Sequence, residues 1–76
     1  MKMPEYVRQN RAITATIKYG MAMQKINAEK LAKAIGEDKT TIYEHMKHPD
    51  KFRLSELRLI SAKLDIPIEK LVKGEI

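Results

Sequence analysis

Two short helical segments separated by a glycine turn constrain this chain more than any other feature. The stretch NAEKLAKAIG begins with Asn27, a favourable N-cap, and places Gly36 where the end of a helix needs left-handed backbone geometry. The stretch DKTTIYEHMKHP follows closely, with Asp38 as its N-cap and Pro49 as its stop. Two helices joined by so tight a turn form a helix-turn-helix unit, which we place at about residues 27–48.

Two further helical segments follow this unit. In LSELRLISAKLDI the apolar residues recur three and four positions apart, at Leu54, Leu57, Ile60 and Leu64. Residues 65–67 interrupt the pattern. PIEKLVKG then predicts a short helix, with Pro67 near its start and Gly74 just past its end.

The stretch ITATIKYG, residues 13–20, permits two interpretations. Its alternation of apolar and polar residues is typical of a half-buried strand. However, Ile13, Ile17 and Met21 also lie four residues apart, which places them on one face of a helix. A lone strand would find no pairing partner among four helices, so we predict a first helix whose apolar stripe extends to Tyr6.

The start of this first helix is less clearly marked. Pro4 suits the first turn of a helix. Gly20 would destabilise the helix by about 1 kcal/mol unless another segment packs closely against it. Residues 1–12 form either an N-terminal arm or an extension of the helix, and a strand before Arg11 stays an alternative. The patterns together predict an all-α fold with a single domain over residues 1–76.

Composition narrows the class of protein further. The chain has 76 residues, enough for one small domain, and no cysteine, which removes disulfides and thiol–metal sites. No apolar run approaches the roughly 20 residues of a membrane helix, so we expect a soluble, cytoplasmic protein with no membrane partner. The net charge is +5, and residues 54–76 carry four basic and four acidic side chains. A surface for a polyanion is therefore expected within residues 1–53.

No catalytic constellation stands out. We find no Ser-His-Asp set, no glycine-rich phosphate loop and no paired-carboxylate motif. His45 and His48, with Asp50 nearby, lack a third strong ligand, so no metal site is predicted. The domain is too small to enclose a substrate pocket comfortably. We therefore expect no enzyme activity, no cofactor and no small-molecule ligand.

Over most of its length, residues 13–73, the chain resembles the Xre-type helix-turn-helix family, which includes the phage Cro proteins and the lambda-type repressors. The family pattern has a small residue in the second helix, a glycine at the turn, an apolar residue in the recognition helix and a late apolar pair. The matching positions here are Ala32, Gly36, Ile42, Leu57 and Leu64. The resemblance implies a five-helix, lambda repressor-like fold that binds double-stranded DNA, commonly as a homodimer on a two-fold operator.

Several positions depart from the family pattern. Glu37 stands where an apolar residue usually follows the turn glycine, and Ala28 stands where a phosphate-contacting glutamine often begins the second helix. The family often pairs an arginine of helix one with a glutamate of the recognition helix, and the matching positions here are Met21 and Met46. Two apolar side chains can replace such a buried ion pair without loss of stability. Arg53 stands where a serine or threonine cap is expected.

By the same resemblance, the recognition helix, about residues 38–47, directs its N-terminal end into the major groove. The predicted base-reading residues are Lys39, Thr40, Tyr43 and Glu44. Lysine can donate to guanine, threonine can contact a base edge or a thymine methyl, and glutamate can accept from cytosine. Each such pairing contributes about 1–3 kcal/mol of discrimination. Alternatively, Tyr43 packs on sugar or phosphate and Glu44 pairs with His48.

The predicted phosphate contacts surround this helix. They are Lys30, Lys33, Lys47, Lys51 and Arg53, with Lys18 and Lys25 as outer candidates. If about five of these side chains engage, the logarithm of the affinity should fall against the logarithm of the salt concentration with a slope of about −4 to −5. The alternative for Lys30 and Lys33 is that they form only the solvated face of an amphipathic helix.

A dimer surface is expected near the C-terminal edge of the domain. Leu59 lies off the main apolar stripe of its helix, and Ile68 and Val72 are further candidates for exposed apolar residues. Alternatively, Leu59 packs under the N-terminal segment.

These features favour a sequence-specific transcriptional regulator of prokaryotic or phage type. Without a second domain to sense a ligand, such a protein would act by occupying its operator, as a Cro-type protein does. The alternative is a protein-interaction module on the same fold, such as an antitoxin-like or phage accessory protein, with little DNA binding. Ala28 and Glu37 leave room for this second interpretation.

Overall fold

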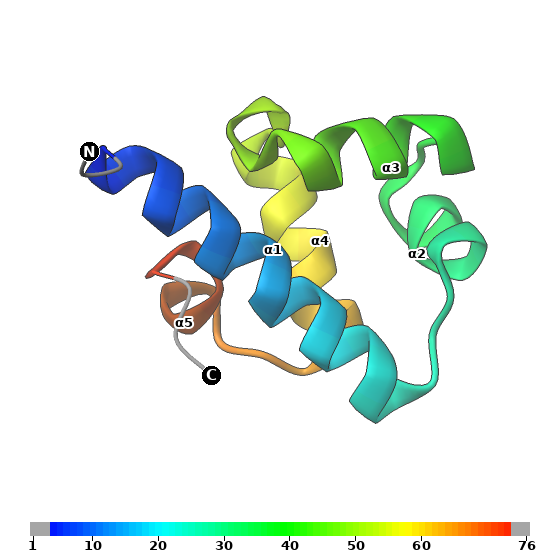
Figure 1. Cartoon of the computed structure of the whole chain (residues 1–76). Helices are drawn as coiled ribbons and strands as arrows, with labels where there is room; N and C mark the ends of the chain where they lie inside the picture. Colours follow the sequence, from blue (N-terminus) through cyan, green and yellow to red (C-terminus); the bar gives the residue numbers. More distant parts are fainter. Residues whose placement is uncertain (1–3, 74–76) are drawn as a thin grey trace.

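Five α-helices and one 3₁₀ turn make up the part of the chain that the computed structural model describes, residues 4–73 (Figure 1). The elements are α1 (Glu5–Gln24), α2 (Ala28–Ile35), α3 (Lys39–Lys47), η1 (Pro49–Lys51), α4 (Leu54–Leu64) and α5 (Ile68–Lys73). Within residues 4–73 there is no strand. The predicted all-α class with five helices is confirmed.

The alternating stretch ITATIKYG is helical throughout, so the strand interpretation is wrong. Its polar Thr16 is buried, and the Thr16 hydroxyl donates a hydrogen bond to the Ala12 carbonyl at 2.8 Å, which satisfies it within the helix. Residues 5–12 belong to α1 and form no arm, whereas residues 1–3 lie outside the described residues. Tyr6 is 66% exposed and does not continue the buried stripe, because α1 extends past the core at that end.

Gly20 is buried where α1 passes the end of α4, which explains a glycine inside a long helix. A Cβ at this position would lie 2.7 Å from Ile66 Cδ1 and 3.1 Å from Leu64 Cβ. The expected close packing at Gly20 is therefore present.

The turn between α2 and α3 forms as its residues predict. The Asn27 side chain accepts a hydrogen bond from the Lys30 backbone N–H at 2.8 Å, and Asp38 accepts one from the Thr41 N–H at 2.7 Å. Gly36 has a φ of 75°, the left-handed geometry that glycine adopts without strain. These local interactions fix where α2 ends and α3 begins.

The helices share one apolar core. Its fully buried aliphatic side chains are Ile17, Leu31, Ile42, Ile60, Leu64 and Leu71. Leu57 packs against this core. Leu54 is 55% exposed, so the prediction that Leu54 belongs to the apolar stripe facing the core is wrong. Successive residues of an α-helix are rotated by about 100°, so the Leu54 side chain points away from the helix face that carries Ile60 and Leu64.

The segment between α3 and α4 is more ordered than a simple helix stop. Pro49 ends α3 and itself begins η1. Phe52, to which the sequence assigned no role, is buried. At the start of α4 the Glu56 carboxylate accepts a hydrogen bond from the Arg53 N–H at 2.9 Å, so the cap is provided from inside the helix. Pro67 precedes α5 as expected, and Gly74 lies outside the described residues.

Candidate nucleic-acid interface

One face of α3 packs on the core and the other faces solvent. Ile42 is 1% exposed, and Met46 packs partly buried against the same core. The predicted base-reading residues Lys39, Thr40, Tyr43 and Glu44 are all exposed. In Figure 1, α3 runs along the edge of the molecule, away from α5. The division of α3 into these two faces agrees with the sequence pattern, and base reading stays a prediction.

Two of these exposed residues are in contact one helical turn apart. The Lys39 ammonium lies 5.9 Å from the centre of the Tyr43 ring. A cation–π contact at an exposed site contributes about 0.5–1 kcal/mol. This contact brings the two side chains together in the N-terminal half of α3.

Glu44 pairs with Lys51 rather than with His48. The Lys51 Nζ donates to Glu44 Oε1 at 3.2 Å, and both side chains are about half exposed. This hydrogen bond lowers the pKa of Glu44. The structure thus brings together a predicted base-reading residue and a predicted phosphate contact, whose charges offset each other in the free protein.

The other predicted phosphate contacts are exposed and lie on α2, at the end of α3 and just before α4. Lys30 and Lys33 lie on α2, whose C-terminal end leads into α3. Lys47 is the last residue of α3, and Arg53 lies just before α4. The outer candidates are exposed too: Lys18 lies in the C-terminal half of α1, and Lys25 directly follows this helix. Ala28, in the place of the family's glutamine, is buried and offers no polar side chain.

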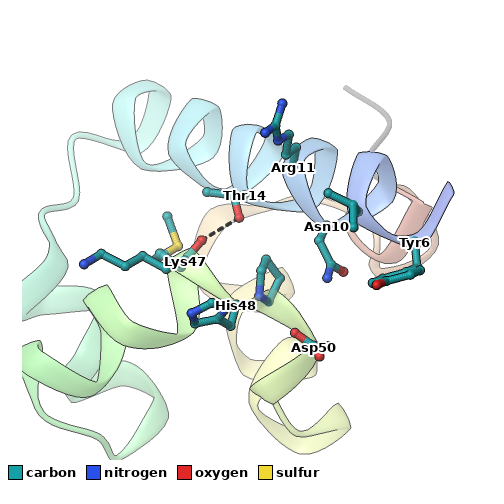
Figure 2. A pocket seen from close by; sticks show the side chains of 10 residues that line it. Tyr6, Asn10, Arg11, Thr14, Lys47, His48 and Asp50 are labelled. Atoms are coloured by element: carbon teal, nitrogen blue, oxygen red, sulfur yellow. Dashed lines mark hydrogen bonds between the residues drawn. The ribbon is translucent and has the colours of Figure 1, made fainter. Parts of the chain in front are cut away.

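A hydrogen bond that the sequence analysis did not foresee ties the end of α3 to α1. The Thr14 hydroxyl donates to the Met46 carbonyl at 2.7 Å (Figure 2). This carbonyl belongs to the last turn of α3, where acceptors lack partners within the helix. Thr14 lies three residues before the buried Ile17 and is partly buried, but nothing in the sequence indicates Met46 as its partner.

Met21 and Met46, the positions matched to the family's ion pair, lie beside the same hollow, and the replacement of an ion pair stays a prediction. Both are partly buried and both line a cavity of about 500 Å³ between α1 and α3. We call this cavity the α1–α3 hollow.

A second cavity of about 500 Å³ lies between the N-terminal half of α1 and η1. Figure 2 shows Tyr6, Asn10, His48 and Asp50 around it. His45 is not part of it, because its ring packs edge-on against Phe52 with the centroids 5.1 Å apart. The two histidines therefore do not face one site, and within residues 4–73 no three potential metal ligands come together.

The predicted dimer residues differ in exposure. Leu59 is 47% exposed. The alternative that it packs under the N-terminal segment is therefore wrong as far as residues 4–12, the described part of that segment, are concerned. Ile68 and Val72 are partly buried, and the Val72 carbonyl accepts a hydrogen bond from Gln9 at 3.3 Å. Leu59 is thus the most exposed of the three predicted residues.

Comparison of the chain with models of protein families, with curated proteins and with solved structures gave no significant match. The likeness to the Xre-type family therefore rests on the residues named above. Among the helices of residues 4–73, none combines the length and the apolar character needed to cross a bilayer.

Proposed function

We propose that the protein is a sequence-specific, double-stranded DNA-binding regulator that acts in the cytoplasm by occupying an operator, in the manner of Cro and the lambda-type repressors. The observation that carries this proposal is the outward face of α3. Lys39, Thr40, Tyr43 and Glu44 are exposed together on a helix held by a glycine turn. A protruding helix with such side chains suits the major groove.

Charge supports the same function. Cationic side chains lie on α2, at the end of α3, in η1 and before α4, and the net charge of +5 favours a polyanion. Contacts of this kind position a protein on DNA without reading its sequence. The Glu44–Lys51 pair would have to open for Glu44 to reach a cytosine while Lys51 reaches a phosphate.

The test is selection of binding sites from a random duplex library with the wild-type protein and with Lys39→Ala and Glu44→Ala. We expect each variant to lose preference at one or two positions of the selected site. Lys63→Ala, an exposed lysine on α4, is the matched control and should select the wild-type site. Uniform weakening without altered preference would limit Lys39 and Glu44 to backbone contacts. No selected sequence at all would refute the proposal.

The regulator is proposed to bind as a homodimer through the surface around Leu59. Exposed apolar side chains at the edge of a small domain favour self-association. We expect the selected site to be a two-fold repeat, and Leu59→Glu to shift the protein towards monomer in sedimentation velocity while leaving its helical circular dichroism unchanged. A monomeric wild type bound to a single half-site would refute the dimer.

A second candidate function is a protein-interaction module. It is favoured by the exposed apolar residues Tyr19 and Met23, which lie one turn apart on the solvent side of α1, away from α3. Retardation of random duplex DNA that disappears as salt is added would support the first function. Absence of any retardation at low salt would support the second.

A further inference from the structure

We infer that the α1–α3 hollow is a binding site for an apolar monocarboxylate, such as a medium-chain fatty acid, whose carboxylate pairs with Lys18 and Lys47. This inference reverses the expectation from sequence that the chain binds no small molecule. Its two walls come from segments far apart along the chain, so no local pattern in the sequence indicates a hollow between them.

The floor of the hollow is apolar. The apolar residues that line the hollow are Met21 on α1, Ala28 on α2, and Ile42 and Met46 on α3. Its volume of about 500 Å³ falls within the range of ordinary ligand sites, which enclose an apolar body with few polar contacts. Methionine side chains adapt to ligands of irregular shape, since they are unbranched and flexible. The floor therefore suits an alkyl chain better than a rigid polar molecule.

The charges at the rim have one sign. Lys18 lies on the α1 wall and Lys47 on the α3 wall, and both are exposed. Among the described residues that line the hollow, none is acidic. Figure 2 shows the Lys47 side chain extending away from Asp50. Two lysines that line an otherwise mostly apolar hollow complement one carboxylate attached to an apolar chain.

The second cavity, between α1 and η1, lacks this complementarity. Arg11 and Lys47 line it together with Asp50, so charges of both signs meet there. Its lining indicates no single class of ligand.

Occupation of the hollow would affect DNA binding, and this consequence rests on the proposed function. Lys47 is a predicted phosphate contact, and Tyr43 lines the hollow while also belonging to the outward face of α3. A carboxylate that pairs with Lys47 competes with a phosphate for the same ammonium group. The ligand should therefore weaken DNA binding.

The test uses sodium decanoate, kept below its micelle concentration, and the whole protein labelled with ¹³C at the methionine methyl groups. We expect saturable shifts of the Met21 and Met46 methyl signals. Met23, exposed on α1 and outside the hollow, is an internal control that should not shift. Decanol should bind more weakly than decanoate, and decylammonium should not bind.

Paired variants test the role of the two lysines. The double variant Lys18→Gln/Lys47→Gln should bind decanoate at least about tenfold more weakly, as expected for the loss of charge-assisted hydrogen bonds, with little change for decanol. Both side chains are exposed, so the fold should persist. The double variant Lys63→Gln/Lys70→Gln, at exposed lysines outside the hollow, is the control of equal charge change. Binding to the wild type and to the double variant with equal affinity would overturn the inference.

Three further outcomes would overturn it: no saturable shift, a shift of Met23 equal to that of Met21, or decylammonium binding as tight as decanoate. The second would show detergent-like adsorption. A parallel titration measures DNA affinity with and without decanoate. Saturable decanoate binding by a protein that binds no DNA would support the site and refute the proposed function, so the two failures are distinguishable.

Discussion

The substitution Gly20→Ala is expected to destabilise the fold, although alanine is the better helix former. In a free helix this change stabilises by about 1 kcal/mol. Here the added methyl group would lie 2.7 Å from Ile66 Cδ1 and 3.1 Å from Leu64 Cβ. The Ile66 methyl can rotate away, but Leu64 Cβ is fixed to the backbone of α4. Relief of such overpacking costs about 1–3 kcal/mol, so the net loss should reach up to about 2 kcal/mol.

The assay is urea unfolding followed by circular dichroism, with the free energy of unfolding taken from the midpoint and slope. Ala15→Gly is the matched control, because Ala15 is exposed on the same helix and reports the helix propensity alone. Ile66→Val removes the Cδ1 atom. In that background Gly20→Ala should be less destabilising by at least about 0.5 kcal/mol, a coupling that a double-mutant cycle resolves.

A higher free energy of unfolding in the Gly20→Ala variant would refute this reasoning. If Gly20→Ala stabilises the protein by as much as Ala15→Gly destabilises it, then α1 and the end of α4 do not approach as closely as the structure has them. Additivity of Gly20→Ala and Ile66→Val would separately exclude the contact with the Ile66 methyl group.

Three further predictions concern α3. Thr14→Val leaves the Met46 carbonyl without its hydroxyl donor and should lower the free energy of unfolding by about 1 kcal/mol, measured by urea unfolding; an unchanged midpoint would contradict the role of this bond. Asp38→Ala should lower the melting temperature at neutral pH. The hydrogen bond from the Thr41 backbone N–H lowers the pKa of Asp38 below its ordinary value of 3.8. The extra stability that Asp38 gives the wild type is therefore complete above pH 3.8 and is lost as the pH falls through the folded-state pKa. The melting temperatures of the two proteins should converge in acid. Glu44→Gln should free Lys51 for a phosphate, tighten binding to random duplex DNA and steepen the salt slope by about one in fluorescence anisotropy; weaker binding would contradict this.

The parts of the fold that the sequence predicts well depend on short-range interactions. Asn27 and Asp38 each cap the N–H of the residue three positions later, and Gly36 supplies its own backbone geometry. Such interactions involve neighbours in the chain, so residue identity and spacing suffice to locate them. The boundaries of α2 and α3 were predictable for this reason.

The errors arise where a periodic pattern continues beyond the core. Tyr6 extends the apolar spacing of α1 and Leu54 that of α4, yet both are exposed. Helical periodicity states which side of a helix a residue faces, but it does not state whether a partner helix lies opposite. Long-range packing decides this, and the sequence pattern does not contain it.

The candidate site shows the same division. The exposed face of α3 was predictable, because Ile42 fixes the buried side of a short helix. The Glu44–Lys51 pair depends on η1 turning the chain back beside α3, and the Thr14–Met46 bond joins residues 32 positions apart. No pattern of neighbouring residues in the sequence predicts either contact.

The way α3 is held connects the two proposals. Within α3, every residue of which the structure describes, Ile42 is the one fully buried side chain. The cap at Asp38 and the bond from Thr14 hold its two ends, and Met46 completes the packing towards α1. A helix fixed by so little burial can shift when the space beside it is filled. If the protein binds DNA as proposed, a ligand between Met21 and Met46 would therefore change both the charge of Lys47 available to a phosphate and the orientation of α3 relative to the DNA. At decanoate concentrations that saturate the Lys47→Gln variant, DNA binding should then still be weakened. An effect abolished by this substitution at saturation would limit the ligand to competition for a single phosphate contact.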